Sequence, residues 1–110
     1  MSLWETQLRK GLAELAILAV LSREEAYGYR IVEKLRTLEG WTLSESTVYP
    51  ILTRLAREGL LSIRTAASPT GPTRRFYQLT PDGKNHLSKL NQSWRSISGS
   101  LETLLAGERS

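Results

Sequence analysis

Apolar residues recur at intervals of three and four along the first half of the chain, and this period predicts helices. We expect a first helix from Trp4 to Leu21, a second from Tyr27 to Leu38 and a third from near Ser46 to the helix-stopping Gly59. The second half of the first helix is apolar on nearly all sides, so it must be covered on more than one side. A chain of 110 residues offers too little material for this, which favours a partner subunit.

After the third helix, apolar and polar residues alternate with a period of two. Leu61 and Ile63 alternate with polar neighbours, as do Tyr77 and Leu79, and this pattern is typical of half-buried strands. The segment 68–73, with two prolines and one glycine, is expected to form the loop between them. A mainly α fold with a small β-hairpin is therefore predicted: a winged helix-turn-helix with the hairpin as its wing.

The clearest helical period lies at the C-terminal end. Thr80 is expected to cap a helix that begins at Pro81, because a hydroxyl accepts from the first free amides and proline fits the first turn. Apolar residues then alternate at spacings of three and four, at Leu87, Leu90, Trp94, Ile97, Leu101 and Leu104. So narrow a stripe is typical of a helix packed on another helix. We predict a homodimer built on this stripe and on Leu12 and Leu15; packing on the first helix of the same chain is the alternative.

Two residues fit poorly inside the expected helices. Gly28 is a weak helix former, so it predicts a close approach of the backbone to a neighbouring element. Pro50 removes a backbone donor unless it falls in the first turn. The third helix is therefore expected to start near Ser46, with a slight bend around Tyr49.

The third helix carries side chains expected of a DNA reader. Its apolar residues share one face, while the other positions hold hydroxyls, a phenol and guanidinium groups with almost no negative charge. Such groups bond phosphates and base edges. The candidates are Ser44, Ser46, Thr47, Tyr49, Pro50, Thr53, Arg54 and Arg57. An ordinary amphipathic helix has the same apolar face, so the hairpin that follows is what favours double-stranded DNA as the partner.

Basic residues gather in and behind this helix. Arg74 and Arg75 lie where the returning strand leaves the wing tip, from which they can reach phosphates or the minor groove. Residues 41–80 carry five basic and two acidic side chains, so they hold three of the net four positive charges, a surplus that counterion release from DNA would favour. Tyr29 and Lys34, off the apolar face of the second helix, are candidates for the DNA backbone.

Five blocks of sequence resemble, in order and spacing, those of the PadR-like transcriptional regulators. They are Leu12–Leu18, Ala26–Ile31, Leu43–Leu55, Glu58–Leu61 and Arg75–Gly83. The resemblance implies a homodimeric repressor of the short subfamily, whose third helix enters the major groove and whose single C-terminal helix dimerises. It matches Tyr49 and Pro50 to the recognition helix. It matches Arg74 and Arg75 to the basic end of the wing. Residues 1–80 would then form the DNA-binding domain and residues 81–110 the dimerisation helix.

Composition narrows the classes of function. The chain has no cysteine and a single histidine, His86, so disulfides and cysteine-based zinc sites are excluded and neither a metal nor a cofactor is expected. Its glycines are scattered singly and no nucleophile lies beside a base, which argues against an enzyme. The apolar run ending at Leu21 is too short to span a membrane, and the N-terminus is no signal peptide, so a cytoplasmic protein is expected. A winged-helix module that binds protein or RNA remains the alternative.

Trp94 has two interpretations. It lies midway along the C-terminal stripe at an a position, where β-branched residues usually pack better in a two-stranded coil. Its indole either fills the dimer core or, with its copy in the partner, lines a gap that takes a small planar aromatic effector, because flat rings stack on indole. Some regulators that this sequence resembles answer to aromatic small molecules, so Trp94 is the candidate effector-binding residue.

Overall fold

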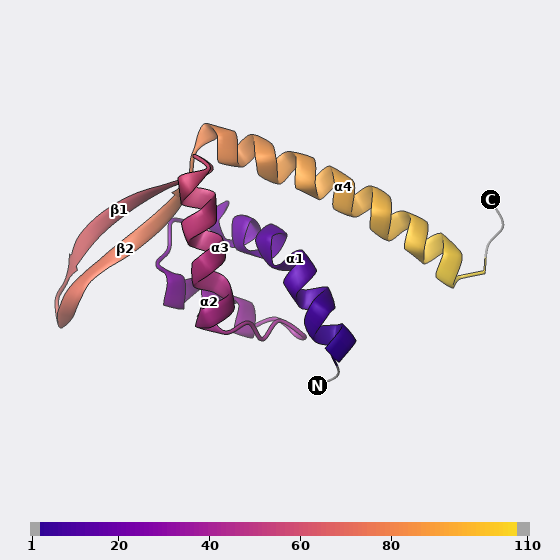
Figure 1. The fold of residues 1–110 in the computed structure, drawn as a ribbon, viewed down its shortest axis with the longest axis horizontal. Helices are drawn as coiled ribbons and strands as arrows, with labels where there is room; N and C mark the ends of the chain where they lie inside the picture. Colours follow the sequence, from indigo (N-terminus) through magenta and orange to yellow (C-terminus); the bar gives the residue numbers. More distant parts are fainter. Residues whose placement is uncertain (1–2, 108–110) are drawn as a thin grey trace.

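The computed structural model describes residues 3–107, which form four helices and one antiparallel hairpin (Figure 1). The helices are α1 (Leu3–Leu21), α2 (Gly28–Arg36), α3 (Glu45–Arg57) and α4 (Pro81–Leu105), and the strands are β1 (Leu61–Ser68) and β2 (Gly71–Leu79). The predicted fold class, a winged helix-turn-helix followed by a C-terminal helix, is confirmed. The outer ends of the two predicted domains, residues 1–2 and 108–110, lie outside the described residues. No helix in the described part of the chain combines the length and apolar character of a membrane span.

Helices α1, α2 and α3 enclose the core. Ile17 and Leu18 of α1, Ile31 of α2, and Leu52 and Leu55 of α3 are fully buried. Burial of an aliphatic side chain of this size contributes roughly 1.5–3 kcal/mol to folding, so these positions supply much of the stability. The core holds α3 with its polar face outward, between α2 and the wing.

The second and third helices differ in their bounds from the expectation. α2 ends at Arg36, where the Thr37 hydroxyl donates to the Lys34 carbonyl oxygen at 2.7 Å. Leu38, expected to end the second helix, lies beyond it and is 55% exposed. α3 begins at Glu45, one residue before the predicted start, so Pro50 lies past the first turn rather than in it. Pro50 is exposed there, and because it has no N–H it cannot donate the helical hydrogen bond to the Ser46 carbonyl oxygen.

The wing is longer than predicted. β1 and β2 pair from Leu61↔Leu79 out to Ser68↔Gly71, so the expected loop 68–73 shrinks to residues 69–70. Ile63 lies on the sheet face that carries Tyr77, yet it is 46% exposed, contrary to the half-buried pattern expected. The reason is that the hairpin projects away from the helices soon after it leaves the core (Figure 1).

The first turn of α4 packs on the turn between α3 and β1. The Thr80 hydroxyl accepts from the Gly83 amide at 3.0 Å and donates to the Gly59 carbonyl oxygen at 2.7 Å. The Thr80 amide donates to the Leu60 carbonyl oxygen at 3.1 Å. The predicted cap is therefore confirmed, and it also ties α4 to the end of α3.

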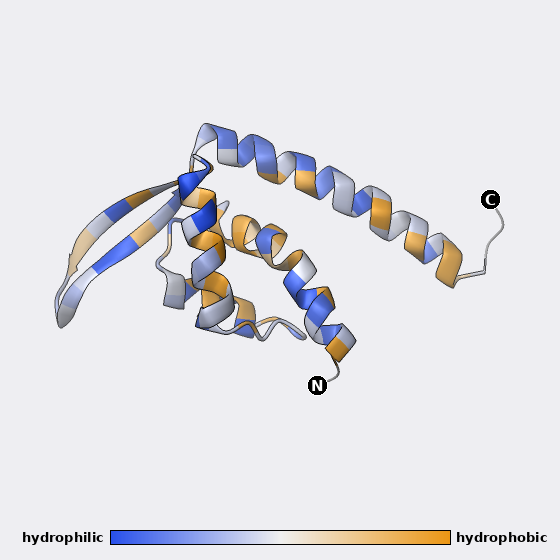
Figure 2. Cartoon of the chain, in the orientation of Figure 1, coloured by the Kyte–Doolittle hydropathy of each residue, from blue (hydrophilic) through white to orange (hydrophobic). Residues whose placement is uncertain are grey.

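Beyond this turn, α4 leaves the rest of the chain. Leu87 and Leu90 pack against the core, whereas Trp94 is 40%, Ile97 58% and Leu104 71% exposed. Figure 2 shows hydrophobic segments recurring along α4 out to its last turn, well past the other helices. Packing within the chain thus explains only the first part of the stripe.

Candidate nucleic-acid interface

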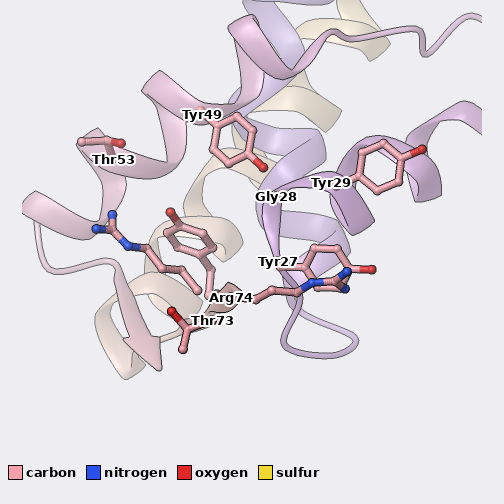
Figure 3. A pocket seen from close by; sticks show the side chains of 9 residues that line it. Tyr27, Gly28, Tyr29, Tyr49, Thr53, Thr73 and Arg74 are labelled. Carbon is pink, nitrogen blue, oxygen red and sulfur yellow. The ribbon is translucent and has the colours of Figure 1, made fainter. Parts of the chain in front are cut away.

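A groove of about 510 Å³ lies between α2, α3 and the wing (Figure 3). The groove is lined by residues from the start of α2 and the position before it, from the middle of α3 and from β2. They are Tyr27, Gly28, Tyr29, Tyr49, Thr53, Thr73, Arg74, Arg75 and Tyr77. All four tyrosines of the chain and two arginines meet here without a carboxylate. Phenols, hydroxyls and guanidinium groups are donors suited to phosphate oxygens. The groove can therefore bind a polyanion.

Five residues predicted separately as DNA-binding meet at this groove: Tyr29, Tyr49, Thr53, Arg74 and Arg75. Sequence reasoning missed Tyr27 and Thr73. Tyr27 was expected to begin the second helix, but it precedes α2 and is only half-buried. The alternation of residues along the returning strand was the available signal, because it places Thr73, Arg75 and Tyr77 on one face.

Tyr49 fixes the α2–α3 side of the groove. A Cβ on Gly28 would lie 2.4 Å from the Tyr49 ring, so the close approach predicted at Gly28 is confirmed. Burial raises the pKa of the Tyr49 phenol, as does the negative charge of Glu45, while a hydrogen bond with the backbone of Tyr29 partly offsets them. The phenol therefore stays protonated at neutral pH and remains a hydrogen-bond donor.

The two wing arginines point to opposite faces of the hairpin. Arg75 pairs with Thr65 and shares the face of Tyr77, whereas Arg74 pairs with Ala66 on the other face. Figure 3 shows Arg74 beside Tyr27, and the Arg74 guanidinium lies over the Tyr27 ring at 4.4 Å from its centroid. Arg75 is exposed and has no ion-pair partner within residues 3–107. The two neighbours thus have different surroundings.

Residues 17–89 match the model of the transcriptional regulator PadR-like family. The chain belongs to this family. PadR-like proteins are transcriptional regulators, so the expectation that the chain is no enzyme agrees with its family.

Two solved structures illustrate the likeness. A PadR-like transcriptional regulator from Bacillus cereus has a TM-score of 0.81 and 38% identity, over 93% of this chain and 99% of that one. PadR of Bacillus subtilis in complex with operator DNA has a TM-score of 0.67 and 32% identity, over 72% of this chain and 45% of that one. In sequence, the negative transcriptional regulator PadR of Bacillus subtilis is 35% identical over 74 residues, or 66% of this chain. The match spans 41% of that relative's length.

Arg54 of this PadR-like regulator lies outside the groove. Its guanidinium forms an ion pair with Glu14 of α1 and another with Glu58, the latter at 3.2 Å. The same Glu14 carboxylate accepts from Nε2 of His86 on α4 at 2.7 Å. Glu14 therefore joins α1, α3 and α4, and it lies 40 residues from Arg54 in sequence, which is why the pattern of the third helix alone suggested DNA binding.

The remaining predicted residues surround the groove without lining it. The hydroxyls of Ser44, Ser46 and Thr47 cluster at the start of α3, with Ser44 Oγ at 2.8 Å from Ser46 Oγ. They share a hollow with Lys10 and Arg36, two basic residues that sequence reasoning did not single out. Lys34 lies 3.8 Å from Glu24 and so has an acidic partner. Arg57 and Pro50 are exposed on α3.

Replacing Glu14 tests the link between the three helices. Burial raises the pKa of Glu14, but the hydrogen bonds and charges of Arg54 and His86 outweigh it and leave the pKa lowered below 4.5. A carboxylate with a lowered pKa in the folded state stabilises the protein above its unfolded pKa, and this contribution is lost as the pH falls through the folded value. We expect Glu14→Gln to reduce the free energy of unfolding by about 1–2 kcal/mol at pH 7.

Urea denaturation at neutral pH and at a series of pH values below about 4.5 measures this effect. The wild-type chain should lose more stability over the acidic interval than Glu14→Gln does, because the variant has no carboxylate to protonate. The exposed Glu39→Gln serves as the matched control and should follow the wild type. Equal stability of Glu14→Gln and wild type at neutral pH would show that the network does not support the fold.

Proposed function

We propose that this PadR-like regulator binds double-stranded operator DNA, with α3 in the major groove and the wing along the adjacent backbone. The observation that carries this proposal is the carboxylate-free groove, in which four tyrosines and two arginines meet beside α3. The similar PadR of Bacillus subtilis was solved with operator DNA, and that relative is described as a negative transcriptional regulator. We infer that this chain likewise acts as a repressor.

The exposed residues divide into two roles in this proposal. Tyr49 and Thr53 line the groove, and Pro50 is exposed beside them on α3. These three residues read base edges, since a helix in the major groove presents its outward positions to the bases. Phosphates are bound by the residues around them, namely Tyr29, Lys34, Ser44, Ser46, Thr47, Arg57 and Arg75. Lys34 would exchange its exposed partner Glu24, 3.8 Å away, for a phosphate. Arg74 is left out because its guanidinium lies over the Tyr27 ring. Arg54 drops out of the reading set because its guanidinium already pairs with Glu14 and Glu58; its role is to hold α3 against α1.

Arg75→Ala is expected to weaken binding to all DNA sequences and to reduce the slope of log affinity against log salt by about 0.9, because one phosphate contact is lost. Fluorescence anisotropy with DNA from the region upstream of the chain's own gene measures both at roughly 50 and 200 mM salt. Lys89→Ala removes an exposed positive charge from α4, which does not line the groove, so its slope should match the wild type. An unchanged slope for Arg75→Ala would remove the wing from the interface.

The same anisotropy measurement on the wild-type chain distinguishes a DNA partner from an RNA partner. Preference for the upstream DNA over an unrelated duplex supports a specific regulator. Equal binding to double-stranded RNA of the same length would favour the RNA-binding alternative, because A-form RNA hides its major groove from side chains.

We further propose a homodimer in which residues 81–110 supply the main interface. Trp94, Ile97, Leu101 and Leu104 are exposed along α4, and Trp4 and Leu8 are exposed along α1. Large exposed apolar stretches on a small protein mark interaction surfaces. A second copy would cover the stripe with an identical stripe, as the isologous interface of a two-fold dimer requires, and Leu12 and Leu15, half-buried on α1, would complete it.

In such a dimer Trp94 would lie near its copy, and the paired indoles would bind a small planar aromatic effector that releases the repressor. Trp94 is 40% exposed in the single chain, and in the dimer either the partner or such a guest would cover this surface. Titration of tryptophan fluorescence with planar aromatic compounds, in wild type and Trp94→Phe, distinguishes an effector site at Trp94 from simple packing against the partner. Quenching that disappears in Trp94→Phe supports the effector site. Absence of quenching in the wild type would leave Trp94 as a residue of the dimer core, and Trp4 and Trp41 provide a constant background.

A further inference from the structure

The face of the wing that carries Arg74 holds a row of cations and aromatic rings, and two of its members, Tyr27 and Arg74, also line the groove. The Arg74 guanidinium lies over the ring of Tyr27, which meets Phe76 edge-on at a centroid distance of 5.5 Å. The Arg64 guanidinium lies 4.9 Å from the Phe76 centroid and is paired with the Glu25 carboxylate. We call these five residues, Glu25, Tyr27, Arg64, Arg74 and Phe76, the wing clamp.

The wing clamp joins the hairpin to the connection between α1 and α2. Arg64 pairs with Phe76 across the two strands, and Arg74 lies two residues along β2 on the same face. Glu25 and Tyr27 belong to the α1–α2 connection. Between them, Ala26 forms a two-way backbone bridge to Tyr77, with N···O distances of 2.8 and 3.1 Å. Backbone and side chains therefore fasten β2 to the same short segment.

The hairpin needs such a fastening because it has few other contacts with the helices. On its opposite face only Leu61, Tyr77 and Leu79 are buried, and all lie at the end where the strands leave the core. A two-stranded hairpin is marginally stable by itself. The clamp supplies side-chain contacts that help to fix the angle of the wing to the helices.

We propose that Tyr27 is a positioning residue that holds the wing, through Arg74, at the angle from which Arg75 faces DNA. This inference rests on the proposed function and assigns different roles to the two neighbouring arginines. Arg74 acts within the protein, where its guanidinium packs on a ring as cations do on the negative face of an aromatic system. Arg75, on the other face, is the cation left to meet a phosphate. A wing that is already fixed in the free protein loses less conformational entropy when DNA binds.

Substitutions at Tyr27 test the proposal by DNA affinity. Tyr27→Leu should weaken binding to the upstream DNA about fivefold, because the cation–π contact is lost, and should leave the salt slope unchanged, because no phosphate contact is lost. Tyr27→Phe keeps the ring and should bind like the wild type. A loss in Tyr27→Phe equal to that in Tyr27→Leu would overturn the proposal, since it would mean that the phenol itself binds DNA.

A double-mutant cycle shows whether Tyr27 acts through Arg74. The double variant Tyr27→Leu/Arg74→Ala should bind no more weakly than Arg74→Ala alone, because the second change removes a contact already lost. Additive losses would mean that the two residues act independently and would overturn the clamp. A reduced salt slope in Arg74→Ala would do the same, because it would place Arg74 on a phosphate.

Amide hydrogen exchange in the free protein tests the clamp without DNA. Faster exchange in Tyr27→Leu than in wild type, confined to the wing residues 64–76, is the expected result, with Tyr27→Phe unchanged. Unaltered exchange in Tyr27→Leu would overturn the proposal. If the wild type bound no DNA at all, the proposed function would fail while the exchange measurement still decided whether Tyr27 holds the wing.

Discussion

Gly83→Ala is expected to lower the free energy of unfolding by about 3 kcal/mol or more, which is a large share of the total stability of a small domain. A Cβ at this position would lie 2.1 Å from the Leu60 carbonyl oxygen. That oxygen is backbone and also accepts from the Thr80 amide, so it cannot move away without breaking the cap that joins α4 to α3. Urea denaturation followed by far-UV circular dichroism measures the loss.

Gly99→Ala provides the matched control in the same helix. A Cβ at Gly99 meets no atom within 4 Å, and the position lies on the face of α4 opposite the apolar stripe. Alanine is favoured over glycine in a helix interior, so this variant should be unchanged or more stable by up to about 1 kcal/mol. If both variants unfolded at the urea concentration of the wild type, α4 would not pack on the α3–β1 turn as described.

The elements that sequence predicted well depend on close neighbours in the chain. The Thr80-Pro81 pair predicts the start of α4, because the Thr80 hydroxyl accepts from the Gly83 amide only three residues away. The helices and their buried faces follow from apolar periods that extend over a few turns. Gly28 suggested a close contact because a glycine was unexpected inside the predicted helix; it is the first residue of α2, and the Tyr49 ring occupies the space a Cβ would need.

The features that sequence missed depend on residues far apart in the chain. Arg54 pairs with Glu58 close by in the chain and with Glu14 on another helix, and the sequence pattern of α3 could not show the second pair. The different surroundings of Arg74 and Arg75 follow from the strand register, which the position of the turn sets. Because the turn was expected over residues 68–73, both arginines were placed at the end of a loop. Once β2 starts at Gly71, alternation sends them to opposite faces.

Ile97→Glu is expected to convert the dimer into folded monomers. Ile97 is 58% exposed in the single chain, so a carboxylate there remains hydrated and the fold is kept. In the proposed dimer the same carboxylate would be buried against its copy without a partner, which is strongly unfavourable. Leu90→Glu should instead unfold the chain, because Leu90 packs against the core. The sequence alone did not distinguish these two outcomes.

Sedimentation velocity at micromolar concentration measures the change in assembly, and far-UV circular dichroism confirms that the monomer is folded. Operator affinity should fall with it by about a hundredfold or more, because two half-sites are no longer bound by linked subunits. Gln92→Glu adds the same charge on the face of α4 away from the stripe, so it should remain dimeric. A wild-type chain that sediments as a well-folded monomer would refute the proposed interface, since the exposed part of the stripe would then have no partner to cover it. An Ile97→Glu variant that stays dimeric would refute it too, because the dimer would then not be built on the stripe.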